Sequence, residues 1–244
     1  WCSAVIRAAC LSMSVSRPVG EADSLDFKRY FYDVSGNQVS PWHDVPVRPS
    51  GAEDNIVNFI CEIPKGTTAK METNKETEWN PFIQDTKKGK LRYYHSSSLV
   101  NYGAIPQTWE DPGHTDPETS LKGDNDPLDA IEIGATPCQS GDIYPVKVVG
   151  ILGMEDGGEM DWKVVVIAVV DPLAANVDCV GFENKDENPG VQEFLTSVRV
   201  WFRDYKIPDG KPANKFAFDD KYLGKSKAVS IVNEQHGFWK KLVS

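Results

Sequence analysis

The sequence has no long apolar run. Among its 244 residues the longest uninterrupted apolar stretch is Val164 to Val170, which has seven residues. A helix that crosses a membrane needs about 20. We therefore expect no membrane partner.

Cysteine is scarce and scattered, and the chain has no N-x-S/T acceptor site for glycosylation. An odd number of cysteines without a C-x-x-C pair argues against a disulfide framework and against a zinc ribbon. This pattern favours a reducing compartment, and we expect a cytoplasmic protein. The five cysteines are Cys2, Cys10, Cys61, Cys138 and Cys179.

Basic charge is also in short supply, because 26 Lys and Arg stand against 36 Asp and Glu, which gives a net charge of −10. A protein that binds nucleic acid through the phosphates needs a positively charged surface. We therefore expect no nucleic-acid partner, whereas an acidic chain is suited to binding cations.

Two common catalytic motifs are missing as well. The phosphate-binding loop G-x-x-x-x-G-K-[ST] and the nucleophile motif G-x-S-x-G do not occur, and the four histidines show no metal-ligand spacing. Their absence disfavours a P-loop nucleotidase, a serine hydrolase and a histidine-bound metal centre.

The first 22 residues differ in composition from the rest. Residues 1–20 contain two arginines and four serines but no acid. Two interpretations remain open: an organelle transit segment, which would place the protein in mitochondria, or a leader before a start at Met13. We expect residues 1–22 to be a flexible extension and residues 23–244 to form a single domain.

Short β-like runs dominate the first two thirds of this domain. They are rich in Val, Ile and aromatic residues and are separated by Gly, Pro, Asn and Asp, as strands are. The run at Val164–Val170 has no polar alternation, so we expect a strand buried on both faces. The predicted strands are Phe27–Val34, Ile56–Ile63, Ala69–Thr73, Leu91–Tyr94, Leu128–Ile133, Tyr144–Leu152 and Lys163–Val170.

The last third changes period. Apolar residues in 191–205 recur at the spacing of one helical face, after Asn188 as an N-cap and Pro189 at the first helical position. A second helical stripe occupies residues 228–242, and Gly237 weakens it. Strands followed by helices predict a mainly β fold of the α+β class, with helices packed against a β-barrel or sheet.

The acids are concentrated in one segment, because residues 110–129 hold seven acids and one lysine. Pro127 favours an extended backbone in which Asp124 and Asp126 point to one side, and Asp129 follows nearby. Converging carboxylates repel one another unless a cation lies between them, and oxygen ligands favour Mg²⁺ or Mn²⁺. The spacing does not fit a calcium-binding EF-hand loop. A solvated acidic turn remains the alternative.

A second acidic group, DGGEMDWK at 156–163, lies between two predicted strands. Its glycines permit a tight turn in which Asp156 and Asp161 approach each other, although acids are common in polar turns. The two acidic groups together could hold several divalent ions.

Basic residues lie at the ends of the predicted strands and helices. Each taken singly is ordinary surface charge. Basic side chains beside metal-binding acids, however, bind a polyanion such as phosphate. These residues are Lys65, Lys70, Arg92, Lys163 and Lys206.

Several segments resemble the soluble family I inorganic pyrophosphatases, in their longer eukaryotic form. GDNDPLDAIEIG (123–134) resembles the aspartate signature of that family. The resemblance covers about residues 23–243, and it implies an OB-like five-stranded β-barrel with flanking helices, a homodimer and Mg²⁺-dependent hydrolysis of pyrophosphate. The other matching segments are CEIP (61–64), TAKME (68–72), NPFIQDTKKGKLR (80–92), NYGAIPQTWEDP (101–112), DGGEMDWK (156–163) and WFRDYKIPDGKP (201–212).

The resemblance also implies a role for each candidate site residue. Asp126 would orient and deprotonate the attacking water, Asp129 would bridge two tightly bound Mg²⁺ ions, and Glu62 would support the cavity rim. The other metal-binding residues would be Asp124, Asp161, Asp156 and, through water, Glu72. The phosphoryl groups would be held by Lys70, Arg92, Tyr102, Lys163, Tyr205 and Lys206, of which Lys70, Arg92 and Tyr102 would also serve catalysis.

Two positions depart from the family pattern. The segment before NYG is shorter than in the family, and Ser98 lies about where a tyrosine near the leaving phosphate is expected. Lys65, a supporting cation, replaces the usual arginine after CEIP and loses its bidentate hydrogen bonding.

The predicted reaction is in-line attack on pyrophosphate by a metal-activated water, without a covalent intermediate. Three alternatives remain open. The first is an enzyme for other phosphoanhydrides, such as short polyphosphate or nucleotides. The second is a binding or scaffold protein whose shortened segment impairs catalysis. The third is an OB-type nucleic-acid binder, which the net charge disfavours.

Overall fold

The computed structural model describes residues 15–181 and 188–244. Residues 1–14 of the predicted flexible extension lie outside the described residues. Residues Val15–Val19 of that extension form strand β1, which pairs antiparallel with β2. The division into an extension at 1–22 and a single domain at 23–244 stays a prediction.

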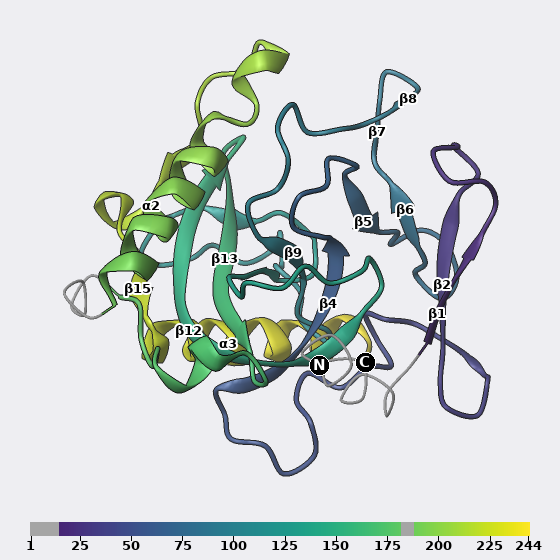
Figure 1. Ribbon diagram of the computed structural model, residues 1–244, viewed down its shortest axis with the longest axis horizontal. Coiled ribbons are helices and arrows are strands. Elements are labelled where there is room, and N and C mark those ends of the chain that lie inside the picture. The colour runs from purple at the N-terminus through teal and green to yellow at the C-terminus, as the bar shows by residue number, and fades with distance from the viewer. Residues whose placement is uncertain (1–14, 182–187) are drawn as a thin grey trace.

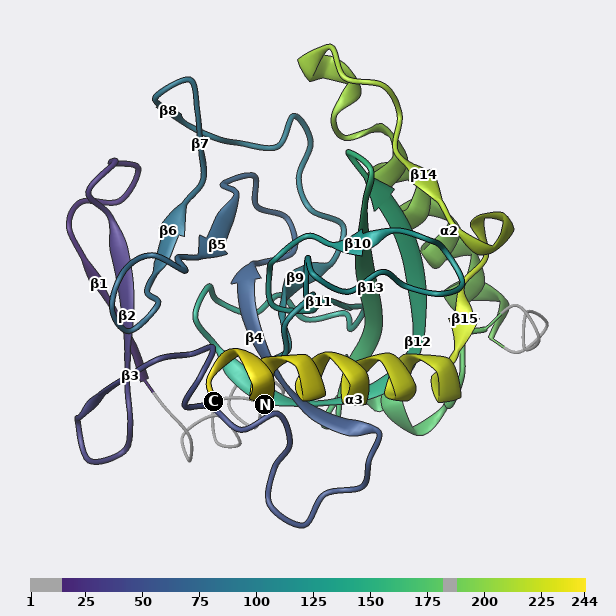
Figure 2. The same cartoon turned by 180° about the vertical axis from the view of Figure 1, so that it is seen from behind.

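Five strands close into a barrel (Figures 1 and 2). The order around the barrel is β4, β9, β11, β13, β12 and back to β4. Among these five strands, only β11 and β13 are parallel neighbours. This is the order 1-2-3-5-4 along the chain, and a five-stranded Greek-key barrel is the OB-type architecture, so the predicted fold class is confirmed. The strands are β4 (Ile56–Ile63), β9 (Asn101–Ala104), β11 (Asp129–Glu132), β12 (Ile143–Asp156) and β13 (Glu159–Ala168).

A second, antiparallel sheet lies beside β4 and contains the N-terminal strands (Figure 1). Its path is β1, β2, β6 and β5, with β3 paired to β2. A separate hairpin of β7 and β8 follows β6. Three two-residue strands, β10, β14 and β15, extend the barrel sheet. The remaining strands are β2 (Lys28–Tyr32), β3 (Gln38–Val39), β5 (Met71–Thr73), β6 (Phe82–Gln84), β7 (Thr86–Lys87), β8 (Lys90–Leu91), β10 (Lys122–Gly123), β14 (Lys215–Phe216) and β15 (Leu223–Gly224).

In the described part of the chain, two α-helices flank the barrel, as the sequence predicts. α2 (Pro189–Asp204) lies beside β12 and β13, and α3 (Lys225–Leu242) crosses one end of the barrel (Figure 2). Neither these nor any other described helix combines the length and the apolar character that a membrane span requires. The short 3₁₀ helices are η1 (Pro172–Ala175), η3 (Ile207–Asp209) and η4 (Phe218–Asp220).

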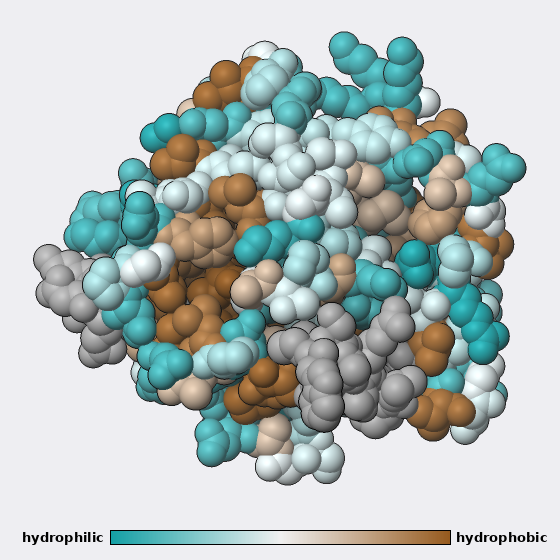
Figure 3. Space-filling view, viewed as in Figure 1, coloured by the Kyte–Doolittle hydropathy of each residue, from teal (hydrophilic) through white to brown (hydrophobic). Residues whose placement is uncertain are grey.

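Side-chain alternation on the barrel strands produces three apolar clusters. The first fills the barrel and includes Phe59, Trp162 and, from α3, Val232. The second lies between the outer face of β11, β12 and β13 and α2. The third lies between the outer face of β4 and the second sheet. Apolar surface beside α2 and over β12 and β13 marks the second cluster (Figure 3).

Three details differ from the sequence predictions. Burial on both faces of β13 ends at Ala168, because the chain turns there and leaves Val169 exposed. Asn188 precedes α2 but does not cap it with its side chain, which instead donates to the Asn176 carbonyl. A strand as short as β6, with three residues, gives no periodic signal, because alternation needs at least four residues to be recognised.

The close packing of β9 on β4 generates a stability prediction. A Cβ at Gly103 would lie 1.9 Å from the Ile60 carbonyl oxygen. We expect Gly103→Ala to lower the free energy of unfolding by about 3 kcal/mol, as overpacking does. Gly237→Ala is the matched control, because nothing lies within 4 Å of its added Cβ and it should stabilise α3 by about 1 kcal/mol. Denaturant unfolding measures both, and equal stability of Gly103→Ala and the parent chain would contradict the packing.

Candidate functional site

A cleft of about 290 Å³ opens on the outer face of the barrel. β5 and the residues after it form one wall, and β9 and the start of β11 form the other. Its lining is mostly charged or polar. The lining residues are Glu62, Lys70, Met71, Glu72, Thr73, Asn74, Lys75, Glu76, Ile83, Tyr102, Ala104, Asp126, Pro127 and Asp129.

Strand register explains why charged side chains meet beside this cleft. β11 and β13 are parallel neighbours, and Asp129 is the register partner of Lys163. Two residues further on, Ile131 and Val165 point outward into the apolar cluster under α2. Since alternate residues share a face, Asp129 and Lys163 also point outward, where the apolar rows end.

Lys163 is the most deeply buried cation of the site, with 2 % of its side chain exposed. Its Nζ donates to Asp129, to Asp161 and, over 3.0 Å, to the Tyr102 hydroxyl. The Tyr102 hydroxyl in turn donates to Asp129. Burial alone would lower the pKa of Lys163, but the two aspartates outweigh it and raise the pKa well above 10.5. The group is therefore a fixed positive charge.

Three carboxylates lie close to one another beside Lys163. Glu110, Asp124 and Asp161 each offer an oxygen, and the three oxygens lie within 4.8 Å of one another. Burial, followed by the neighbouring acids, raises the pKa of Asp124 to about 7 and those of Glu110 and Asp161 well above their usual values. Carboxylates held this closely fit a hard divalent cation, because the cation removes their repulsion. This donor set could hold a metal ion.

The backbone in this segment differs from the prediction. Residues 124–126 are not extended, because Asn125 has a φ of 71° and the Asp126 amide donates to Asp124 Oδ1 over 2.9 Å. This turn separates the two carboxylates. Asp124 joins Glu110 and Asp161, whereas Asp126 faces the cleft and accepts from Lys75. Glu110 thus completes the acid group, although it was not predicted to have a specific role.

The second acidic group forms the predicted hairpin turn. Gly157 and Gly158, both with positive φ, connect β12 to β13. Asp156, at the end of β12, accepts from Lys206 and, over 3.2 Å, from the Tyr205 hydroxyl. The turn at the end of α2 therefore brings a lysine and a tyrosine to this carboxylate.

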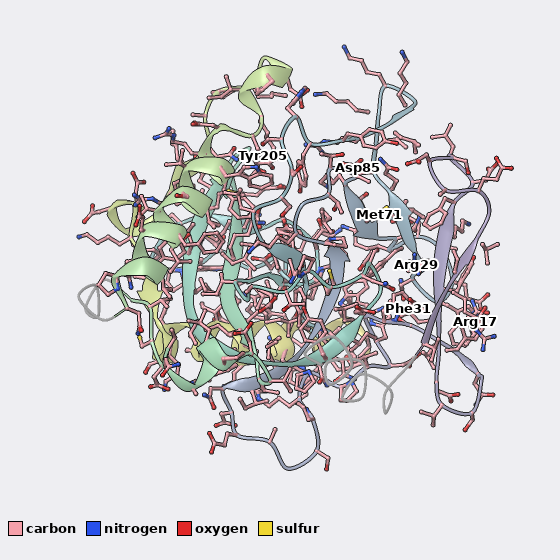
Figure 4. All side chains as sticks on the ribbon, in the orientation of Figure 1. Arg17, Arg29, Phe31, Met71, Asp85 and Tyr205 are labelled. Carbon is pink, nitrogen blue, oxygen red and sulfur yellow. The ribbon has the colours of Figure 1, made fainter. Side chains whose placement is uncertain are left out.

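Another charged group lies on the wall formed by the second sheet. Lys70 pairs with Glu72 over 2.7 Å and with Asp85 over 3.2 Å, and Arg92 donates to the same Asp85 oxygen over 2.7 Å. The two cations lower the pKa of Asp85 against the effect of burial. Tyr205, at the end of α2, and Asp85, beyond β6, lie on opposite sides of the region above the barrel strands (Figure 4).

The two supporting residues have different positions. Glu62 lines the cleft and accepts from the Thr73 amide (2.9 Å) and hydroxyl (2.7 Å). Burial, with Asp129 nearby, raises the pKa of Glu62 to about 8. Lys65 is not brought to the cleft, because its Nζ lies 3.4 Å from the Gly134 carbonyl oxygen and above the Phe194 ring.

The shortened segment before β9 also turns away from the site. Ser98 is buried, and its hydroxyl donates to the Val100 carbonyl over 2.7 Å. Tyr94 lies closer to the charged groups, because its ring contacts those of Trp201 (5.0 Å) and Tyr205 (5.7 Å). Burial raises the pKa of Tyr94 to about 12, although Lys70 and Lys163 act in the opposite direction.

The structure thus gathers nearly all the predicted site residues around one region, with Lys65 directed elsewhere. Lys75, Asp85, Tyr94 and Glu110 were not predicted as site residues. Lys75 lies next to a segment that carries the resemblance and Asp85 lies inside one. The partner of Lys75, Asp126, is 51 residues away, so spacing alone could not identify Lys75.

Comparison with known proteins agrees with this geometry. The family described as inorganic pyrophosphatase matches residues 59–240. The chloroplastic soluble inorganic pyrophosphatase 6 of Arabidopsis thaliana is 50% identical over 226 residues, which are 92% of this chain and 73% of that protein. The inorganic pyrophosphatase of Candida albicans is 45% identical over 238 residues, which are 96% and 81% of the two chains.

Solved structures show the same relationship. The inorganic pyrophosphatase of Schistosoma japonicum has a TM-score of 0.86 and 45% identity, covering 94% of this chain and 80% of that one. An N-terminally truncated vacuolar soluble pyrophosphatase of Trypanosoma cruzi, in complex with PPi, has a TM-score of 0.85 and 41% identity, covering 94% and 91%. The chain belongs to the inorganic pyrophosphatase family.

Proposed function

We propose that the chain hydrolyses inorganic pyrophosphate to two orthophosphates, with Mg²⁺ as its cofactor and water as the attacking group. The observation that carries the proposal is the alternation of buried acids and basic groups around one cleft, on a chain of this family. Phosphoryl transfer requires acidic side chains that bind metal cations and basic side chains that bind the phosphoryl oxygens. The complex of the Trypanosoma cruzi relative with PPi supports the choice of substrate.

We propose that Asp124, Asp129 and Asp161 would hold the tightly bound metal ions. Asp156 and, through water, Glu72 would help to hold the ions that accompany the substrate. The fit is supported by the chemistry of the donors, which are carboxylate oxygens without histidine or cysteine. Mg²⁺, or Mn²⁺ in its place, would lower the pKa of a bound water and neutralise phosphate charge.

The side chains of the protein have two further roles, which are activation of the attacking water and binding of the phosphoryl groups. Asp126, which lines the cleft and is half exposed, orients the attacking water and accepts its proton. Its ion pair with Lys75 must loosen for this role. The phosphoryl oxygens are bound by the groups that now pair with carboxylates, namely Lys70, Arg92, Tyr102, Lys163, Tyr205 and Lys206.

Assembly and location are part of the same proposal. We propose a homodimer in the cytoplasm, as the resemblance and the cysteine pattern predict. A mitochondrial location is the alternative if residues 1–22 belong to a transit segment.

The primary test is release of orthophosphate from pyrophosphate across a titration of Mg²⁺. We expect turnover to require Mg²⁺, because the attacking water is activated and the phosphate charge is neutralised only when a divalent cation is bound. ATP, offered under the same conditions, should release phosphate far more slowly. Turnover that is independent of divalent cations, or equal rates on ATP, would overturn the proposal.

Two substitutions separate the roles of neighbouring aspartates. Asp126→Asn should lower kcat by about 10²–10⁴-fold, the usual contribution of a general base, while Mg²⁺ affinity changes little. Asp129→Ala should also weaken Mg²⁺ binding, so that high Mg²⁺ partly restores its activity. Phosphate release and Mg²⁺ titration calorimetry measure the two effects. Near-normal turnover of Asp126→Asn would remove Asp126 from its proposed role.

We further propose that Tyr94 supplies the phenol that the shortened segment lacks at Ser98. The proposal is supported by the contact of its ring with Tyr205 and by its burial at 8% exposure. No residue within 15–181 or 188–244 forms a side-chain hydrogen bond with the Tyr94 hydroxyl, which therefore remains able to donate to a substrate oxygen.

Tyr94→Phe tests this assignment, with Tyr93→Phe as the matched control. We expect Tyr94→Phe to lower kcat at least about tenfold, because a donor to the transition state is lost. Tyr93 is exposed and its hydroxyl lies 3.0 Å from Asp23 Oδ1, so its variant should keep the parent kcat. Steady-state phosphate release measures both variants, and equal kcat values would contradict the role of Tyr94.

A further inference from the structure

A second, much smaller cavity lies behind the acid group, at the end of the barrel that α3 covers. It has a volume of about 10 Å³ and shares no lining residue with the cleft. One side of it is formed by the segment from Glu110 to Gly123, and the other by α3. The lining residues are Glu110, Asp111, His114, Asp116, Leu121, Gly123, Met160, Trp162, Gln235 and Phe238.

Three polar atoms of this lining are buried and have no hydrogen-bond partner among the described residues. They are Glu110 Oε2, His114 Nε2 and Gln235 Oε1. Glu110 and Gln235 are 2% and 5% exposed. The other Glu110 oxygen accepts from the Trp162 amide over 3.1 Å, and the acid nearest to His114 Nε2 is Glu234, at 4.0 Å. A buried polar atom without a hydrogen-bond partner destabilises the folded chain, and three in one cavity indicate a ligand.

We propose that this cavity binds one water molecule, held by Glu110, His114 and Gln235. The volume matches a single water, which needs about 10–15 Å³ and two to four polar partners. Water donates to the carboxylate and amide oxygens and accepts from His114 Nε2–H, so that all three atoms are paired. A metal cation would leave the imidazole proton unpaired in that tautomer, so water fits better than an ion.

The bound water joins α3 to the proposed metal ligands. Glu110 carries one oxygen in the group with Asp124 and Asp161, and its backbone holds the neighbouring turn. The Glu110 amide donates to the Asp126 carbonyl, and the Asn125 amide donates to the Glu110 carbonyl, both over 2.9 Å. Gln235 is thus a positioning residue: through the water it fixes Glu110, and through Glu110 it fixes the acids that bind metal.

The first test uses the unmodified protein and does not depend on its activity. A crystal structure at high resolution should show one peak within hydrogen-bond distance of all three atoms, with the electron count and distances of water. An empty cavity would overturn the proposal, as would a peak with the short contacts of a metal ion.

The second test compares two Gln→Met substitutions. Gln235→Met keeps the side-chain volume but removes one water partner, whereas Gln192→Met makes the same change on α2, where the amide reaches the Val180 carbonyl over 3.4 Å. We expect Gln235→Met to weaken Mn²⁺ binding to the substrate-free protein about tenfold, as loss of an outer partner of a metal site does. Its kcat at saturating Mg²⁺ should stay within about twofold of the parent value. The control, Gln192→Met, should keep the parent Mn²⁺ affinity and the parent kcat.

His114→Phe provides a second variant if Gln235→Met fails to fold. His114 is only half buried, and its loss should weaken Mn²⁺ binding in the same direction. Electron paramagnetic resonance measures free Mn²⁺ in each case. Parent-like Mn²⁺ affinity in a folded Gln235→Met or His114→Phe protein would overturn the positioning role. The link between this water and metal binding rests on the proposed function. The water peak and the Mn²⁺ titration, however, are both measured without substrate. A protein that bound the water and Mn²⁺ but did not hydrolyse pyrophosphate would therefore contradict only the proposed function.

Discussion

The burial of Lys163 between two aspartates is the interaction on which the rest of the site depends. An ammonium group withdrawn from water costs several kcal/mol unless carboxylates and hydrogen bonds compensate it. The parallel register of β11 and β13 supplies Asp129, and alternation along β13 supplies Asp161 two residues away. Both constraints come from the closed barrel, so the apolar packing of the fold determines where the charged groups lie.

The parts of the site that follow from local pattern could be predicted from the sequence. β4 coincides with a run of apolar and aromatic residues, and the glycine pair after Asp156 forms the expected turn. The aspartates themselves stand in one short segment, and their residue type and spacing already indicate a cation. These features need only the neighbours along the chain.

The partners of these residues could not be predicted, because they depend on contacts between distant segments. Glu110 meets Asp161 only because the barrel brings residues 51 positions apart together, and Lys75 reaches Asp126 across a similar separation. The left-handed backbone at Asn125 reverses the direction expected from Pro127. A proline preference is a weak local bias, and the Glu110 backbone, which holds both ends of this turn, overrides it.

The pairing of the basic groups has a consequence for the order in which ligands are admitted. Lys70, Lys163 and Lys206 each rest against a carboxylate of the same chain. An anion must therefore compete with an internal carboxylate, and a cation must compete with an internal ammonium group. A cation that engages the acids frees the lysines, and linkage requires that the anion strengthen cation binding by the same factor. The resting ion pairs thus make the protein selective for an anion that arrives with its counter-ion, and they discriminate against equally charged anions that arrive alone.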